Sequence, residues 1–386
     1  MKSILGVLSV SMLAIACGPV EAPNNEAGFI TLLGNDTLAV EKFEKIGNRV
    51  SAQVVLRSPR TRLSSYELIL DDTGGIDTYT VRNHPLEEGF NGSSEISRSY
   101  AREGDSLITK VLTNDGTYRD LMTPYEPGIL PFIDMVHWPF ELAFNYAAEV
   151  DADSINQRLI TGSRASTFVI AKIASDSMTI RHPSRGVMGV DVNAEGDIME
   201  LDAGLTTRKL VVSRTDEVDI DAVAKRFAEA DKNGSPFGAL SGAVTETFTV
   251  GHAEFEVSYG SPKRRGRDLF GGIVPFGQRW RTGANRATHF KTSKDLKIGS
   301  LTVPAAEYTL FTIPEADGGT LIINKQTGQN GRTYDESRDL GRVPMTVMTK
   351  SDNTEDFTIT VEEGPNGGRL NLIWGETVYY VDFTVQ

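Results

Sequence analysis

Short strand-like segments separated by tight turns recur along most of the chain, and they constrain its fold more than any other feature. The segments are rich in β-branched and aromatic residues, as in Val50–Leu56 and Leu107–Leu112, which is typical of strands. Turn sequences such as Asp72–Gly75 and Asn114–Gly116 separate neighbouring segments. Strands joined this closely must be antiparallel, so we predict a mainly β protein.

Two segments have a helical period instead. Pro131–Val150 carries aromatic residues at helical spacing, and Pro139 should start or kink a helix there. Asp219–Ala230 has an apolar stripe, with Asp219 in the N-cap position and Gly234 as a stop. We therefore expect one or two helices within the β pattern.

The length of 386 residues is typical of about two domains. Residues 233–244 are rich in Gly, Ser and Pro and are predicted to form a linker. Residues 29–232 are predicted to form an antiparallel β meander or half-barrel. Residues 245–386 are predicted to form a jelly-roll-like β-sandwich.

The first residues have the features of an export signal. Lys2 precedes a short apolar run, and Ala14-Ile15-Ala16 forms a small-x-small cleavage signal. The run is shorter than the roughly 20 apolar residues that span a bilayer. We predict a signal peptide over residues 1–16, which leaves Cys17, the only cysteine of the chain, at the new N-terminus.

Leu13–Cys17 resembles a bacterial lipobox, with Leu13 one place earlier than in the usual pattern. Lipidation of Cys17 would anchor an exported protein to a bacterial membrane, at the periplasm or cell surface, through a tether over residues 17–28. The alternative is ordinary secretion after the same cleavage, with a free thiol. A single cysteine permits neither a disulfide nor a thiolate metal site within the chain.

Charge is distributed unevenly. The net charge of -13 argues against nucleic-acid binding. Residues 259–297 nevertheless contain ten Lys or Arg and two Asp, a local charge of +8 that leaves -21 for the rest. One reading is an anion site, because guanidinium groups bind carboxylate or phosphate in bidentate fashion. The other is that these cations pair with the acidic surface and brace the fold.

The same stretch carries ordered sequence blocks, which continue toward the C-terminus. They are Tyr259–Pro262, Arg265–Gly271, Val274–Gly277, Trp280–Asn285, Tyr308–Pro314, Asn324-Lys325, Tyr334-Asp335 and Trp374-Gly375. From about residue 246 onward the chain resembles the domain-of-unknown-function 2911 family (DUF 2911). This resemblance implies an exported bacterial β domain of unestablished function. The N-terminal half lies outside it and is only loosely similar to the half-barrels of lipid-binding exported proteins.

Trp280–Asn285 is the segment that we expect to form a site. Its Arg, Thr and Asn side chains supply donors and an amide for a small polar or anionic ligand, although the same residues also suit a purely structural turn. His289 is a candidate acid or base. The candidate ligand-binding residues are Arg267, Arg281, Asn285, His289 and Lys325.

Other chemistry has little support in the sequence. The five histidines form no paired metal motif, and no Gly-x-Ser-x-Gly nucleophile motif is present. We therefore predict no metal and no cofactor. Three hypotheses remain open: a binding or envelope-associated protein, an enzyme of unassigned class that uses the same loop, and a lipid carrier through the N-terminal half-barrel.

Overall fold

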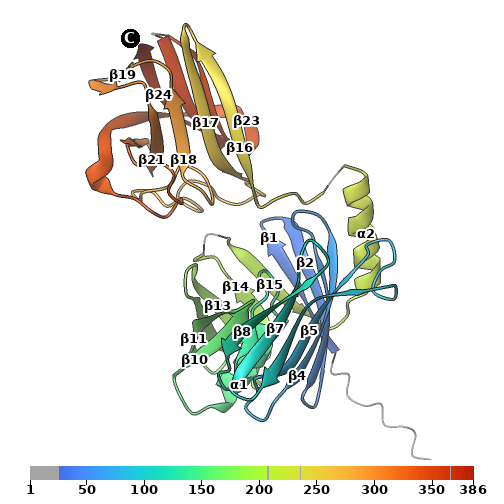
Figure 1. The fold of residues 1–386 in the computed structure, drawn as a ribbon. Helices are drawn as coiled ribbons and strands as arrows, with labels where there is room; N and C mark the ends of the chain where they lie inside the picture. The colour runs from blue at the N-terminus through green and yellow to red at the C-terminus, as the bar shows by residue number, and fades with distance from the viewer. Residues whose placement is uncertain (1–25, 207, 235, 366) are drawn as a thin grey trace, which may run out of the picture.

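The computed structural model describes residues 26–206, 208–234, 236–365 and 367–386, which form two β-rich domains (Figure 1). The predicted signal peptide, Cys17 and the tether as far as residue 25 lie outside the described residues. Strand β1 (Glu26–Leu33) begins within the predicted tether, and strand β16 (Ser241–Val250) begins within the predicted linker. The mainly β fold class is confirmed.

The N-terminal domain contains one sheet of 15 strands. After β1 come β2 (Asp36–Ile46), β3 (Arg49–Leu56), β4 (Arg62–Leu70), β5 (Ile76–His84), β6 (Glu95–Glu103), β7 (Ser106–Leu112), β8 (Tyr118–Pro124), β9 (Leu130–Pro131), β10 (Ser154–Thr161), β11 (Arg164–Ala174), β12 (Ser177–His182), β13 (Gly186–Val192), β14 (Ile198–Asp202) and β15 (Leu210–Thr215). Strands adjacent in the chain are mostly adjacent in the sheet, as expected of a meander. The pairing of β1 with β15 joins the two arms, β1–β8 and β9–β15, which are blue to cyan and green in Figure 1.

This sheet curves around helix α1 (Trp138–Glu149). The far ends of the two arms meet, because Gly162 N donates to Tyr100 Oη (2.9 Å) and Thr123 Oγ1 donates to Ser163 O (3.2 Å). Most residues of α1 are buried in a single core with side chains from both arms. A helix that is apolar on nearly all sides is a buried helix, so α1 fills the half-barrel.

The helix predicted over Pro131–Val150 is shorter than expected. It starts at Trp138, because Pro139 is tolerated only in the first turn of a helix, and Pro131 belongs to the short strand β9. Helix α2 (Ile220–Lys232) follows its prediction closely, and the Asp219 side chain accepts a hydrogen bond from Ala222 N (2.9 Å). It packs against β2 and β3 through a separate apolar cluster.

The C-terminal domain contains a sheet of nine strands. After β16 come β17 (Ala253–Pro262), β18 (Thr288–Thr292), β19 (Leu296–Ile298), β20 (Leu301–Val303), β21 (Glu307–Glu315), β22 (Gly318–Asn324), β23 (Asp339–Gly364) and β24 (Gly367–Val385), with a short 3-10 helix, η1 (Glu336–Arg338), before β23. Their order is β16-β17-β18-β21-β22-β23-β24-β19-β20. Residues 296–303 form the hairpin of β19 and β20, which turns at Gly299 with φ 58°.

The sheet of the C-terminal domain folds over on itself. Tyr259 on β17 meets Phe357 on β23, with ring centroids 5.8 Å apart, and Phe255 meets Phe383 on β24 at 5.4 Å. These strands are far apart in the strand order, so their side chains can meet only across two layers. Such layering is the predicted β-sandwich.

Candidate functional site

The loop between β17 and β18 carries most of the cationic residues, and its Trp280–Asn285 turn is fixed to the sandwich at several points. Trp280 exchanges two backbone hydrogen bonds with Thr312 on β21, at 2.7 and 2.9 Å. Ala284 N donates to Gly260 O on β17 (2.9 Å), and Thr288 Oγ1 donates to Thr282 O (2.7 Å). The turn is therefore held by three consecutive strands of the sheet, β17, β18 and β21.

The backbone of this turn is strained. Thr282 has φ 54° and Asn285 has φ 64°, and a β-branched residue in this region is a genuine outlier. Thr282 is fully buried, and its Oγ1 donates to Thr312 Oγ1 (3.2 Å). Strain of this kind persists only where the surroundings enforce it, so we regard the turn as rigid.

A cavity of about 470 Å³ lies against this turn, within the range of small-molecule sites. Both domains contribute to its wall. The lining residues are Leu33, Arg208, Leu240, Ser241, Pro262, Arg267, Ile273, Val274, Pro275, Gln278, Arg279, Trp280, Arg281, Gly283, Ala284, Asn285, Phe311, Gly331, Arg332 and Trp374. Five of these are arginines, and none of these described residues is acidic. We call this space the arginine cavity.

The domain contact that forms the arginine cavity depends on Arg265. Its Nη1 donates to Asp36 Oδ2 and its Nη2 to Phe237 O, both at 2.7 Å. The guanidinium lies 3.7 Å from the centre of the Phe237 ring, and Asn35 N donates to Arg265 O (3.1 Å). Arg265 thereby joins the β1–β2 turn to the C-terminal domain and brings Leu33 to the cavity wall.

Arg267 is held by backbone carbonyls. It donates to the carbonyls of Lys263 (2.6 Å), Arg264 (3.0 Å) and Arg208 (3.1 Å). Burial, followed by the nearby Arg265, lowers the pKa of Arg267 to about 10. Its charge faces the cavity from a fixed position and has no carboxylate partner among the described residues.

Arg281 lies near Arg332, and both line the cavity. The Arg281 side chain packs against the backbone of Gly331, and burial followed by the neighbouring Arg332 lowers its pKa. Arg281 Nε donates over a long 3.4 Å to Gly283 O. Across residues 26–206, 208–234, 236–365 and 367–386, neither guanidinium has a carboxylate within 4.0 Å. Two nearby cations therefore face the cavity without a counter-charge.

Arg208 brings a further cation from the N-terminal domain. Its two terminal nitrogens bind Asp134 at 2.6 and 2.8 Å, and Arg185 binds the same carboxylate at 2.6 Å. Burial raises the pKa of Asp134, but the hydrogen bonds from these arginines outweigh it and lower the pKa to about 2. Arg208 is thereby anchored at the cavity edge.

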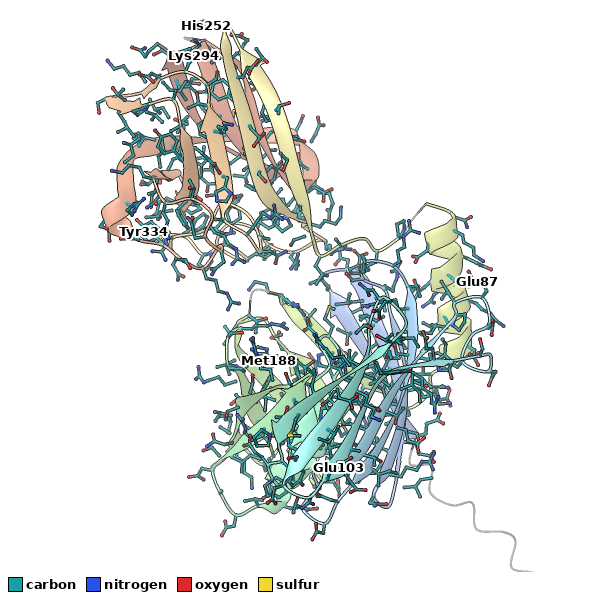
Figure 2. The ribbon with its side chains drawn as sticks, viewed as in Figure 1. Glu87, Glu103, Met188, His252, Lys294 and Tyr334 are labelled. Carbon is teal, nitrogen blue, oxygen red and sulfur yellow. The ribbon has the colours of Figure 1, made fainter. Side chains whose placement is uncertain are left out.

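The remaining arginine of the wall, Arg279, lies over an aromatic ring. Its guanidinium is 3.9 Å from the centre of the Tyr334 ring, and Figure 2 labels Tyr334 at the end of the C-terminal domain nearest the N-terminal sheet. Such a contact orients the side chain without neutralising it. Like Arg281 and Arg332, Arg279 has no carboxylate within 4.0 Å in the described part of the chain.

The arginine cavity brings together Arg267, Arg281 and Asn285. His289 and Lys325 are not among its lining residues. His289 Nε2 accepts a hydrogen bond from Gly328 N (3.3 Å), and Lys325 follows β22, where its backbone N donates to Arg338 O (2.9 Å). Sequence reasoning did not assign Arg208, Arg279 or Arg332 to the site.

No group of three or more His, Cys, Asp or Glu residues is placed to hold a metal ion among the residues that the structure describes. In the same residues, no helix combines the length and apolar character needed to cross a membrane.

Comparisons with known proteins match part of the chain to a family model. No curated protein matches it. Among solved structures, it is similar to a DUF1089 family protein from Pseudomonas aeruginosa, with a TM-score of 0.33 and 11% identity over 44% of this chain and 91% of that one. A mutant of HCR/D has a TM-score of 0.13 and 7% identity, and the match covers 92% of this chain and 88% of that one. Residues 241–383 match the model of the family described as protein of unknown function (DUF2911), which is the family that the sequence of the C-terminal domain resembles.

Proposed function

We propose that this protein is a binding protein that takes a small anionic ligand in the arginine cavity. The observation that carries the proposal is that Arg281 and Arg332 are nearby cations of the same cavity wall, and neither has a carboxylate partner among the described residues. Like charges at close range repel one another. An anion between them would relieve that repulsion and accept hydrogen bonds that are strong because both partners are charged.

The composition of the wall favours binding over catalysis. Besides the arginines, its polar side chains are Ser241, Gln278 and Asn285, and no histidine or carboxylate lines the described cavity. His289, the candidate acid or base, lies elsewhere on β18. General acid-base catalysis needs such a group within hydrogen-bond reach of the substrate, and the enzyme hypothesis has no observation of this kind in its favour.

The lipid-carrier hypothesis is also less favoured. Helix α1 occupies the interior of the N-terminal half-barrel. The cavity beside the start of α1, lined by Phe132, His137 and Phe140 among others, measures only about 30 Å³. A water molecule alone takes up roughly this volume in the liquid, so the observed packing supplies no room for an acyl chain there.

Titration with inorganic pyrophosphate tests the proposed binding. The wild-type protein should bind it in low-salt buffer, measured by isothermal calorimetry. Arg281→Gln removes one charge and its hydrogen bonds, which are worth about 1.5–3 kcal/mol to a charged partner, so the affinity should fall roughly 10- to 100-fold.

Arg286→Gln is the matched control for this titration. Arg286 is exposed and belongs to the same loop, but it does not line the cavity. Its replacement should change the affinity for pyrophosphate less than about threefold, because exposed charges contribute little. Absence of binding by the wild type, or an equal loss in both variants, would contradict the proposal.

We further propose that the protein is exported and held at a bacterial membrane by a lipid on Cys17. The support is the sequence around this only cysteine, which follows a short apolar run and a small-x-small cleavage signal. Metabolic labelling with palmitate should mark the wild-type protein and not Cys17→Ala. An unlabelled wild type, with the signal peptide removed, would indicate ordinary secretion instead.

A further inference from the structure

We infer that the ligand of the arginine cavity is amphipathic: an anionic group bound by Arg281 and Arg332 that is joined to an aromatic or similarly flat apolar body lying on Trp280. This inference rests on the proposed function and narrows it to a chemical class. It follows from the size of the cavity, from the apolar part of its wall and from the position of Trp280 next to the unpaired cations.

The arginine cavity is too large for a simple inorganic anion. Its volume is about 470 Å³, whereas one water molecule takes up roughly 30 Å³ in the liquid. A phosphate or sulfate ion between Arg281 and Arg332 would leave most of this space to water. Volumes of this size hold ligands of drug or cofactor size, which bury most of their surface.

Much of the remaining wall is apolar. It includes Leu33 from the N-terminal domain, Leu240 from the connecting segment, and Ile273, Pro275 and Phe311 from the C-terminal domain. Water against such side chains is unfavourable. An apolar body would displace that water, and its contacts would reach both domains.

Trp280 supplies a flat surface. It stacks on Trp374 with ring centroids 6.1 Å apart and planes 8° apart, and its edge contacts with Phe270 and Phe357 fix its orientation. Trp280 is only half-buried by these contacts and lines the cavity. A fixed, partly exposed indole favours stacking with a planar ligand.

The aromatic surface lies next to the cations, because Trp280 and Arg281 are consecutive residues of the chain. Trp280 directly precedes Arg281, and the rigid turn described above fixes both residues. A ligand that stacks on Trp280 would therefore place an attached anionic group within reach of the guanidinium pair. A ligand with only the anionic group would leave the apolar wall and Trp280 without a partner, and a ligand with only the apolar body would leave the guanidinium groups without one.

Two fluorescent probes with related rings test the inference. 8-Anilinonaphthalene-1-sulfonate carries an anionic group on an aromatic body, and N-phenyl-1-naphthylamine has the same rings without the sulfonate. The first should bind with a stoichiometry of about one, be displaced by pyrophosphate, and bind at least about tenfold more tightly than pyrophosphate, since apolar burial adds to the ionic contact. The second should bind at least about tenfold more weakly than the first.

Two variants separate the parts of the site. Arg281→Gln should weaken the sulfonate probe and pyrophosphate alike. Ile273→Ala trims the apolar wall, so it should weaken the sulfonate probe about fivefold and leave pyrophosphate binding unchanged. Circular dichroism and the unfolding midpoint would verify that both variants fold.

The possible failures are distinguishable. If pyrophosphate binds and the sulfonate probe binds no more tightly, or if Ile273→Ala weakens both equally, the inference fails and the proposed function stands. If the two aromatic probes bind equally and Arg281→Gln has no effect on either, the cavity is merely apolar and the inference fails. If neither pyrophosphate nor the sulfonate probe binds, the proposed function fails with it.

Discussion

Gly260→Ala is expected to destabilise the C-terminal domain by about 3 kcal/mol or more, at the upper end of the usual cost of overpacking, and to weaken pyrophosphate binding. A Cβ at this position on β17 would lie 1.9 Å from the carbonyl oxygen of Ala284. That oxygen cannot easily move away, because Ala284 N is hydrogen-bonded to Gly260 O and the turn is also fixed to Thr312. The substitution must therefore separate the Trp280–Asn285 turn from the sandwich.

The matched control is Gly242→Ala on the neighbouring strand β16. A Cβ there would meet no atom within 4 Å, and Gly242 does not have a positive φ. We expect its free energy of unfolding to stay within about 0.5 kcal/mol of the wild type. Urea unfolding followed by tryptophan fluorescence measures both variants. Similar stability of Gly260→Ala and Gly242→Ala would show that the turn is not pressed against β17.

Glu41→Gln is expected to destabilise the N-terminal domain by about 3 kcal/mol, as the disruption of a buried charged contact usually does. Glu41 on β2 is fully buried, and its carboxylate accepts from the backbone N–H groups of His137 (2.9 Å) and Trp138 (3.0 Å). These groups begin α1, where N–H groups lack partners within the helix and the helix dipole favours negative charge. A glutamine would remove that charge and place an amide N–H₂ against donors.

Glu44→Gln is the control for this second substitution. Glu44 lies on the same strand but is exposed, so its replacement should cost less than about 0.5 kcal/mol. Urea unfolding monitored by far-ultraviolet circular dichroism compares the two variants. If Glu41→Gln proved as stable as Glu44→Gln, the Glu41 carboxylate would not be what holds α1 in the half-barrel.

The local elements could be predicted because their signals are local. Asp219 begins α2 as its N-cap, and segments such as Val50–Leu56 form strands because β-branched side chains suit a pleated, half-buried surface. The long strand β23 is an exception, because its local signal is interrupted. Its earlier part contains the polar run Lys350–Asp356, which resembles a loop, but shifts in register let the strand pass through this run and bend.

The candidate site was predictable only in part. The Trp280–Asn285 turn could be located from its own sequence, whereas Arg208 joins it from another domain through a contact made by Arg265. Sequence proximity was misleading for His289. It lies on β18 between the buried Thr288 and Phe290. Successive side chains of a strand point to opposite faces of the sheet, so His289 points to the face opposite that of Thr288 and Phe290.

The pairing of β1 with β15 sets an order on the assembly of the N-terminal domain. Gly28 is paired with Thr215, 187 positions later in the chain. One edge of β1 therefore has no hydrogen-bonded neighbour until β15, the last strand of the domain, has formed. Pairing across such a separation is slow because a long loop must close first. Strand β15, which completes the sheet, begins two residues after Arg208. The N-terminal wall of the arginine cavity therefore takes its place only when this final gap in the sheet is filled.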